Sequence, residues 1–441
     1  MRAVSCPPSS SSWSRSFTMS AIAFAVWLFA ASSAVAFPGE LDPTFSRDGS
    51  AVTRFRNSYS VATDVALQAD GRVVVVGPVH TDGTIVSDFG IVRFTAGGKR
   101  DTTFSTNGKR RVDLDDRYDQ AVAVALQPDG RIVVVGTSGG EVTILRLMPD
   151  GALDDSFSDD GHRSIDAGEF ATVGDVTIQE DARIVIVGSD GPDIAVARLD
   201  PDGALDDGFG DGGIVHTDVA GYGDAATAVI VDAGGNVVAG GWAMVSPEQR
   251  TDFAVVRYLP DGSPDPGFGL DGVATTDFRS WEDSVTELAV DASGAILAAG
   301  QASDEPGWAD QASDVGIARY LADGSLDPGF GDAGIATTDF GSYFDQAHGL
   351  AVQADGRIVV SSHRYSDGMR TAAVTRYESD GELDATFGDG GIADTGRAVS
   401  GDEVGDLVLQ PDGAIVLSSA ALVPTATGST FAFLTLRLRA D

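Results

Sequence analysis

Seven copies of one short motif divide this chain at nearly even intervals. Each copy places Asp three residues before a Phe and ends on Gly, as in LDPTFSRDG and LDPGFGDAG. The copies occupy residues 41–49, 100–108, 153–161, 205–213, 264–272, 326–334 and 383–391. Spacings of 52 to 62 residues between successive Phe positions indicate a repeated supersecondary unit with loops of variable length. The unit is too long for one coil of a parallel β-helix.

A second element of each unit predicts a β-hairpin. It is an apolar strand, a tip such as Ala-Asp-Gly or Pro-Asp-Gly, and a second apolar strand, as in VALQADGRVVVVG. Pro or Ala suits the first corner of the tip, Asp bonds the backbone ahead of it, and Gly accepts the positive φ of the turn. The hairpins span residues 65–77, 124–136, 176–188, 228–241, 287–300, 350–362 and 407–419. Runs such as Val73–Val76 indicate strands that are covered on both faces.

The last strand of each unit ends in Arg, which we interpret as a structural residue. Strand alternation puts Arg257 on the same face as Val255 and Phe253, so the guanidinium needs a buried partner. The recurring Asp of the Phe motif is the natural candidate. The arginines are Arg93, Arg146, Arg198, Arg257, Arg319, Arg376 and Arg437, and the aspartates are Asp42, Asp101, Asp154, Asp206, Asp265, Asp327 and Asp384.

The two ends of the repeat region favour a closed ring. Gly39-Glu40-Leu41-Asp42 matches residues 381–384, and the chain stops where the turn before those residues would begin. A ring leaves no free sheet edge, whereas an open solenoid needs atypical end units with polar outer faces. Because 55 glycines and many Val, Ile and Thr residues favour short strands, we predict an all-β fold. It is a seven-bladed β-propeller of four-stranded antiparallel blades, with residues 37–441 as one domain.

The sequence motifs of the units resemble those of a known group, the bacterial delta-60 repeat proteins. The shared elements are LDxxFGxxG, QxDGRIVVVG and VxRYxxDG, in that order, over about residues 39–441. That family is regarded as propeller-forming and has no established activity. The resemblance therefore implies the fold and supplies no functional residues. Unit 3 departs from the pattern, because Ala182 stands where Gly is expected.

The first 36 residues read as a signal peptide. Arg2 and Arg15 precede the apolar stretch 21–31, and Ala34-Val35-Ala36 fits signal peptidase. Cleavage before Phe37 would export the protein to the periplasm, the cell surface or the medium. The alternatives are an uncleaved anchor, for which the apolar stretch is short, and translation from Met19, which would remove both arginines.

The net charge limits the possible partners, and the cysteine content limits the possible chemistry. The formal net charge is −37, which repels nucleic acid and anionic lipid and attracts cations or basic partners. Acidity also serves solubility in an exported protein. The one cysteine, Cys6, lies in the leader, so the mature chain has no disulfide and no thiol nucleophile.

We expect a binding surface at the end of the propeller that carries the variable loops. The Asp-Gly turns lie at the other end and barely vary, whereas the loops before the fourth strands of units 4, 5 and 6 are long. Trp242, Trp281, Trp308 and Tyr365 are candidates for stacking on a glycan or a peptide, and each is otherwise a loop anchor. We expect a monomer that binds a protein or glycan and no nucleic acid.

Acidic residues at the same end suggest a metal site. If they point inward, Asp119, Asp224, Asp283, Asp345 and Asp402 would form a partial ring of oxygen ligands for Ca²⁺ at the channel mouth. The alternative is that each Asp caps the following strand or is solvated. No EF-hand spacing is present.

Enzyme signatures are weaker than these binding features. His80, His162, His216, His348 and His363 occupy unrelated places in their units, and the chain has no G-x-S-x-G, H-E-x-x-H or phosphate-binding motif. The leading hypothesis is an exported binding or scaffold propeller without catalysis. The alternative is a Ca²⁺-dependent propeller hydrolase or lyase with an acidic channel mouth.

Overall fold

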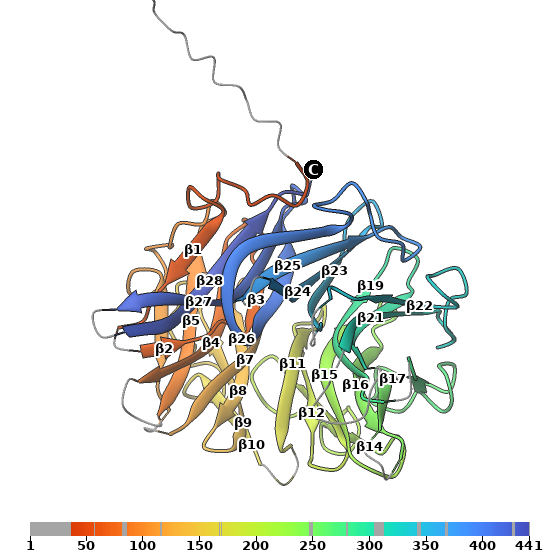
Figure 1. Cartoon of the computed structure of the whole chain (residues 1–441). Coiled ribbons are helices and arrows are strands. Elements are labelled where there is room, and N and C mark those ends of the chain that lie inside the picture. Colours follow the sequence, from red (N-terminus) through yellow and green to blue (C-terminus); the bar gives the residue numbers. More distant parts are fainter. Residues whose placement is uncertain are drawn as a thin grey trace, which may run out of the picture. The chain divides into compact units, whose positions relative to one another are not determined.

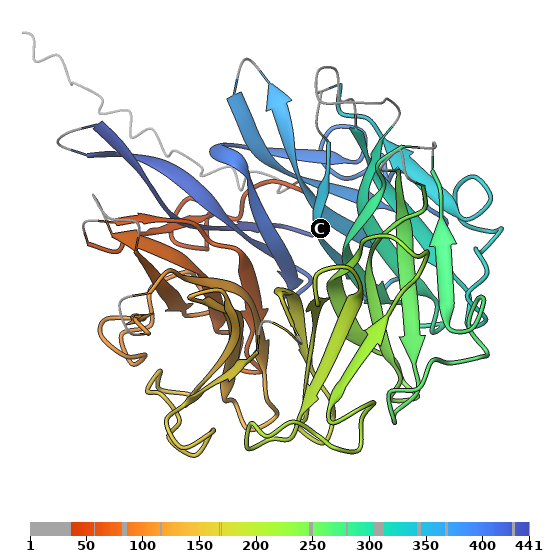
Figure 2. The same cartoon turned by 90° about the horizontal axis from the view of Figure 1, so that it is seen from below.

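Seven four-stranded antiparallel blades surround a central channel in the computed structural model (Figures 1 and 2). The structure describes residues 37–440 except 57, 82–85, 115–116, 167, 169, 247–249, 279–280, 304–312, 342–344, 367–368 and 426–427. The predicted signal peptide therefore lies outside the described residues. In the described part, no helix has the length and apolar character needed to cross a membrane.

The first four blades run from the innermost to the outermost strand in chain order. Blade 1 has an interrupted inner strand, β2 (Ser58–Ser60) and β3 (Asp64–Leu67), then β4 (Val73–Thr81), β5 (Ser87–Phe94) and β6 (Lys109–Val112). Blade 2 is β7 (Asp119–Leu126), β8 (Ile132–Ser138), β9 (Glu141–Leu147) and β10 (His162–Ile165). Blade 3 is β11 (Thr172–Ile178), β12 (Ile184–Ser189), β13 (Ile194–Leu199) and β14 (Ile214–Thr217). Blade 4 is β15 (Asp224–Val231), β16 (Val237–Met244), β17 (Thr251–Tyr258) and β18 (Val273–Thr276).

The remaining blades complete the ring. Blade 5 is β19 (Ser284–Val290), β20 (Ile296–Ser303), β21 (Ser313–Tyr320) and β22 (Ile335–Thr338). Blade 6 is β23 (Ala347–Val352), β24 (Ile358–Ser366), β25 (Met369–Tyr377) and the first part of β26 (Ile392–Leu409). Blade 7 is the second part of β26, β27 (Ile415–Thr425), β28 (Gly428–Leu438) and β1 (Ser50–Thr53).

The ring closes through the first strand of the chain. β1 pairs with β28, so the outermost strand of blade 7 comes from the beginning of the sequence. The Gly39 amide also donates to the Arg439 carbonyl at 2.8 Å. Each repeat gives its first strand to the preceding blade and its other three strands to the next. The predicted closed propeller is confirmed, with each blade built from two successive repeats.

Hydrophobic side chains fill the spaces between neighbouring blades. Val74, Val76 and Phe89 of blade 1 pack with Ile132 and Val134 of blade 2 in one buried cluster. All four residues of Val73–Val76 are fully buried, which agrees with strands covered on both faces. Each blade therefore depends on its neighbours for burial.

The hairpin tips form as expected, and unit 3 does so at a conformational cost. Gly71 has φ 81° and Gly130 has φ 85°, the left-handed conformation that Gly accepts readily. Ala182 takes the equivalent place with φ 68°. An L-residue with a side chain is strained in this conformation.

Candidate functional site

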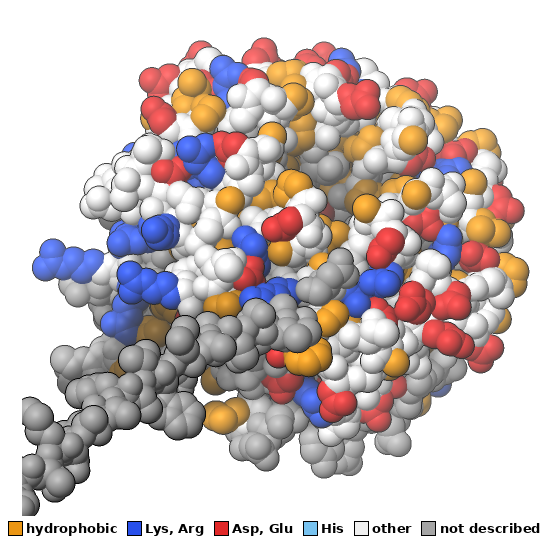
Figure 3. Space-filling model, turned by 90° about the horizontal axis from the view of Figure 1, so that it is seen from above, with side chains coloured by type: hydrophobic (Ala, Val, Ile, Leu, Met, Phe, Trp, Pro, Cys, Tyr) orange, Lys and Arg blue, Asp and Glu red, His pale blue; other side chains and the backbone are white. Residues whose placement is uncertain are grey.

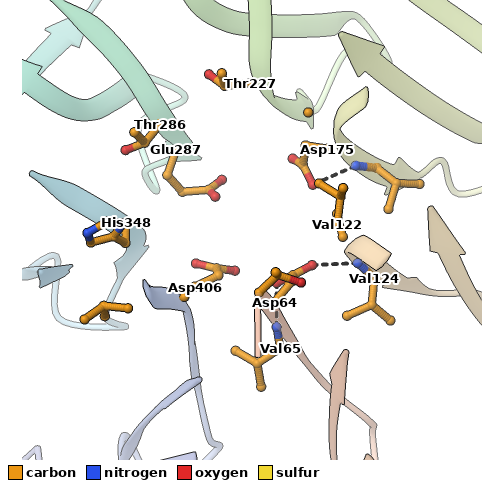
Figure 4. Close-up of a pocket in the computed structure, with 16 residues that line it drawn as sticks. Asp64, Val65, Val122, Val124, Asp175, Thr227, Thr286, Glu287, His348 and Asp406 are labelled. Carbon is orange, nitrogen blue, oxygen red and sulfur yellow. Dashed lines mark hydrogen bonds between the residues drawn. The ribbon is translucent and has the colours of Figure 1, made fainter. Parts of the chain in front are cut away.

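Four acidic side chains from alternate blades line a cavity of about 350 Å³ in the central channel. They are Asp64, Asp175, Glu287 and Asp406 of blades 1, 3, 5 and 7, and Figure 4 shows their carboxyl groups turned toward the cavity. The equivalent positions of blades 2, 4 and 6 carry only small residues, Ala123, Ala228 and Gly349. These small residues separate the acids, except between blades 7 and 1, where Asp406 and Asp64 are neighbours.

Bulges in the innermost strands position this ring. In blades 2 to 7 the register between the inner strand and its neighbour shifts at this point, as between Ala121 and Ala123. Such bulges leave backbone amides unpaired in the ladder. Asp64 accepts hydrogen bonds from the amides of Val65 at 2.5 Å and of Val124, in the next blade, at 2.6 Å. The carboxylates therefore bridge neighbouring blades.

Burial and mutual proximity raise the pKa values of these four acids. Burial raises the pKa of Asp64 to about 6, and burial together with the charge of Asp64 raises the pKa of Asp175 to about 7. Burial and the neighbouring acids also raise the pKa values of Glu287 and Asp406 well above their usual range. The ring is therefore partly protonated near neutral pH.

Sequence reasoning missed this ring, although a signal was present. Each of the four acids directly precedes the apolar segment that leads into the hairpin tip of its unit. An acid that interrupts an inner strand in alternate units marks a position facing the channel. His348 also lines the cavity, and its Nε2 lies 3.1 Å from Nδ1 of His363, so two of the five histidines do meet.

A second arrangement consists of four clusters of three aspartates, each at the junction of two blades. One Asp begins the third strand of a blade, one follows the fourth strand, and one begins or precedes the inner strand of the next blade. In each cluster one carboxylate oxygen per residue lies within 4.8 Å of the others. The clusters are Asp88, Asp113 and Asp119; Asp193, Asp218 and Asp224; Asp252, Asp277 and Asp283; and Asp314, Asp339 and Asp345. In all four the second Asp follows the first by 25 residues and precedes the third by six.

The third Asp of each cluster also fixes the loop that leads to it. Asp119 accepts a hydrogen bond at 2.9 Å from the amide of Leu114, five residues earlier. The equivalent bonds join Asp224 to Val219 at 2.6 Å, Asp283 to Phe278 at 2.8 Å and Asp345 to Phe340 at 2.7 Å. This bond turns each side chain back toward the preceding blade. These four predicted metal ligands thus lie in four separate clusters, and the side chain of Asp402 lies outside the described residues.

Electrostatic repulsion is concentrated in these clusters. Burial, and secondarily the charge of Asp277, raises the pKa of Asp252 to about 6. Burial raises the pKa of Asp283 to about 6, with Asp277 and Asp252 adding to the effect. Asp224 is only 1% exposed, and its Oδ1 has no hydrogen-bond partner among the described residues. Buried carboxylate oxygens without partners are unfavourable unless a cation approaches them.

The aromatic candidates are dispersed. Trp242 is half-buried in β16, opposite Ala225 of β15 and Phe253 of β17. Trp281 is half-buried under the guanidinium of Arg250, 4.7 Å from the ring centroid. Trp308 lies outside the described residues, as does the side chain of Tyr365.

Comparison with known families identifies the repeat. Six segments match a family described as "Domain of unknown function (DUF5122) beta-propeller", namely residues 68–104, 127–157, 179–209, 235–268, 292–330 and 353–387. Six segments of the chain are therefore similar to the repeat of this β-propeller family. The delta-60 resemblance remains a prediction from the quoted motifs.

The boundaries of the matched segments separate the first Asp of each three-aspartate cluster from the other two. Each matched segment runs from a hairpin to the Phe of the next motif, and four of the six segments include the first Asp of a cluster. The second and third aspartates, such as Asp218 and Asp224, fall between matched segments. Two of the three residues in every cluster therefore lie outside the segments that match this family.

Solved structures similar to this protein are distant. Virginiamycin B lyase from Staphylococcus aureus is 10% identical over 88% of this chain and 97% of that chain, with a TM-score of 0.48. Drosophila Semaphorin 1b, extracellular domains 1-2, is 8% identical over 90% and 87%, with a TM-score of 0.47. The β-propeller domain of the trilobed protease from Pyrococcus furiosus is 12% identical over 88% and 97%, with a TM-score of 0.44. Likenesses this distant concern the fold alone. A comparison with curated proteins found no match.

Proposed function

We propose that this protein is an exported, non-catalytic binding propeller that holds divalent cations, Ca²⁺ above all, between neighbouring blades. The observation that carries the proposal is the recurrence of the three-aspartate cluster at four blade junctions with constant sequence spacing. One junction could gather acids by chance in a chain of this charge. Four equivalent junctions indicate a common purpose.

The ligand chemistry of each cluster suits a hard cation. Ca²⁺ prefers carboxylate and carbonyl oxygens and tolerates irregular geometry with water completing its shell. Three aspartates whose oxygens lie within 4.8 Å repel one another, and a bound cation would remove that repulsion. The unpartnered Oδ1 of Asp224 would gain a ligand.

Cation binding at a blade junction would serve recognition by the loops. Each cluster joins the third strand of one blade to the inner strand of the next, through the loop that the third Asp caps. A cation there would fix that loop relative to the neighbouring blade. Rigid loops of variable sequence lose less entropy when they bind a partner.

Calorimetric titration of the purified protein with Ca²⁺ tests the proposal directly. We expect binding that EDTA reverses, and a melting temperature several degrees higher in Ca²⁺ than in EDTA. The Asp218→Asn/Asp277→Asn variant should bind fewer ions and still fold, because Asp224 and Asp283, which accept the bonds from the amides of Val219 and Phe278, are retained. No binding, with equal melting temperatures in Ca²⁺ and EDTA, would refute the proposal.

The chain provides its own matched control. At the junction of blades 2 and 3, Glu141, Asp166 and Thr172 take the three cluster positions, so one acid is missing. The Glu141→Gln/Asp166→Asn variant removes the same number of charges as the test variant. It should bind as many ions as the unmodified protein, and a loss of ions there would show that general acidity attracts them.

A further inference from the structure

A row of four aromatic rings crosses the junctions of blades 7, 1 and 2. The ring centroids of Tyr118 and His80 lie 5.9 Å apart, those of His80 and Tyr59 lie 5.3 Å apart, and those of Tyr59 and Phe431 lie 5.0 Å apart. Tyr118 is 47% exposed, and the other three side chains are half-buried. The row thus presents apolar ring surface to solvent across three blades.

Positive charge collects beside this row. From Arg47 to Arg111, Lys and Arg outnumber Asp and Glu by ten to six, in a chain whose net charge is −37. Figure 3 shows Lys and Arg side chains gathered at the left edge of the molecule, on the side where Figure 1 places β1 and β27. Acidic side chains are spread over the rest of that face.

Contacts join the positive residues to the aromatic row. Arg54 Nη2 donates to the Pro424 carbonyl at 2.6 Å, on the hairpin that carries Phe431. Lys109 Nζ donates to the Arg54 carbonyl at 2.5 Å, and Arg111 donates to Thr81 Oγ1, next to His80. We call Arg54, Arg56, Lys109, Arg110 and Arg111 the basic patch. Arg54, Lys109 and Arg111 of this patch thus lie beside the aromatic row.

The basic patch is not explained by protection of a sheet edge alone. Lys109, Arg110 and Arg111 lie on β6, the outer strand of blade 1, and charged edge strands resist aggregation. The outer strands β14, β18 and β22 of other blades end in Thr instead. Arg54 and Arg56 lie beyond the end of β1 and protect no edge. Within the patch Arg111 is paired with Asp88. Burial and the neighbouring charge of Arg100 lower the pKa of Lys109.

We propose that the aromatic row and the basic patch bind an anionic polysaccharide, with sugar rings against the aromatic side chains and carboxylate or sulfate groups on the cations. Aromatic faces accept the apolar C–H faces of pyranose rings, and Arg forms paired hydrogen bonds with planar anions. Such a glycan carries sparse charge, unlike duplex DNA, with one charge per about 1.7 Å. The acidic remainder of the molecule would repel so dense a polyanion.

Binding of polygalacturonate to the full-length protein in EDTA tests this surface apart from the proposed cation sites. We expect binding that salt weakens, no binding of neutral dextran, and weaker binding of single-stranded DNA than of polygalacturonate. Tyr59→Ala and the double variant Arg54→Ala/Lys109→Ala should each weaken binding by about tenfold or more. Unchanged melting temperatures will show that these variants fold.

Two matched variants remove a cation or a tyrosine ring from other blades. Arg163→Ala removes a cation from β10, the outer strand of blade 2, and Tyr222→Ala removes a ring that is 43% exposed near blade 4. Both should bind polygalacturonate as the unmodified protein does. Equal losses in the test and matched variants, tighter binding of DNA, or no binding of polygalacturonate would overturn the proposal.

Discussion

Arg437 Nη2 lies 2.7 Å from Asp42 Oδ2, so the two ends of the chain meet in an ion pair. It is the seventh copy of a contact that all the units share. In the other six pairs, such as Arg146–Asp154 at 2.7 Å, the Asp follows the Arg by eight residues. The guanidinium of Arg146 also stacks 4.8 Å from the Phe157 ring centroid. The Arg–Asp pairing predicted from the repeats is confirmed, and the seventh pair forms where the ring closes.

The seven Arg–Asp pairs differ in burial. Replacing the Asp of a more deeply buried pair should therefore cost more stability. Arg376 and Asp384 are each 1% exposed, whereas Arg319 and Asp327 are 17% and 20% exposed and lie 3.4 Å apart. Asp384→Ala leaves a buried guanidinium without its carboxylate, and should lower the free energy of unfolding by about 3–5 kcal/mol. Asp327→Ala should cost clearly less, because Arg319 keeps Asp291 at 2.5 Å. Urea unfolding of both variants measures the difference, and equal losses would contradict it.

The channel acids predict a pH-dependent contribution to stability. Asp175 has a pKa of about 7 in the folded chain and 3.8 as its ordinary value, so the folded state holds the proton more tightly between these limits. Its contribution therefore falls as pH rises from about 4 to about 7. The stability of the unmodified protein relative to Asp175→Asn should decline over that window and level off above it. Chemical denaturation at several pH values measures this, with a variant of an exposed aspartate, Asp211→Asn, as the control.

The strained hairpin of unit 3 predicts a stabilising substitution. Ala182→Gly relieves a left-handed conformation that costs about 1–2 kcal/mol and adds unfolded-state entropy worth about 0.5–1 kcal/mol. We expect a net gain of about 0.5–1 kcal/mol in thermal or urea unfolding. The reverse change at the equivalent tip, Gly130→Ala, should destabilise by a similar amount. Its Cβ would meet Pro149 at an ordinary 3.6 Å, so the backbone would be the cause.

Cation binding should compete with protons. Asp252 and Asp283 share one cluster, and each has a pKa of about 6. Ca²⁺ must displace their protons at pH 5.5 and meets mostly carboxylates at pH 7.5. Calorimetry should therefore show an affinity at least about tenfold higher at pH 7.5. An affinity that does not change with pH would mean that these aspartates are not ligands.

The sequence predicted what every repeat shares. Hairpin tips, the Arg–Asp pairs and the Phe positions recur seven times, so periodicity alone separates them from chance. Asp64 and Glu287 were missed because they occur only in alternate units and depend on a bulge that propensity does not reveal. The aspartates Asp119 and Asp224 were found as candidates, but their grouping needed residues such as Asp88 and Asp193 from the preceding blade.

The sharing of strands between repeats limits how this molecule can change in size. A deletion from one Phe motif to the next removes the outer strand of one blade and three strands of the following blade, yet joins the remaining strands into a complete sheet. A deletion of half that length leaves one blade incomplete, with an unpaired edge strand. Ring size in such a protein therefore changes in steps of a full repeat, while loop sequences at the junctions vary without affecting closure.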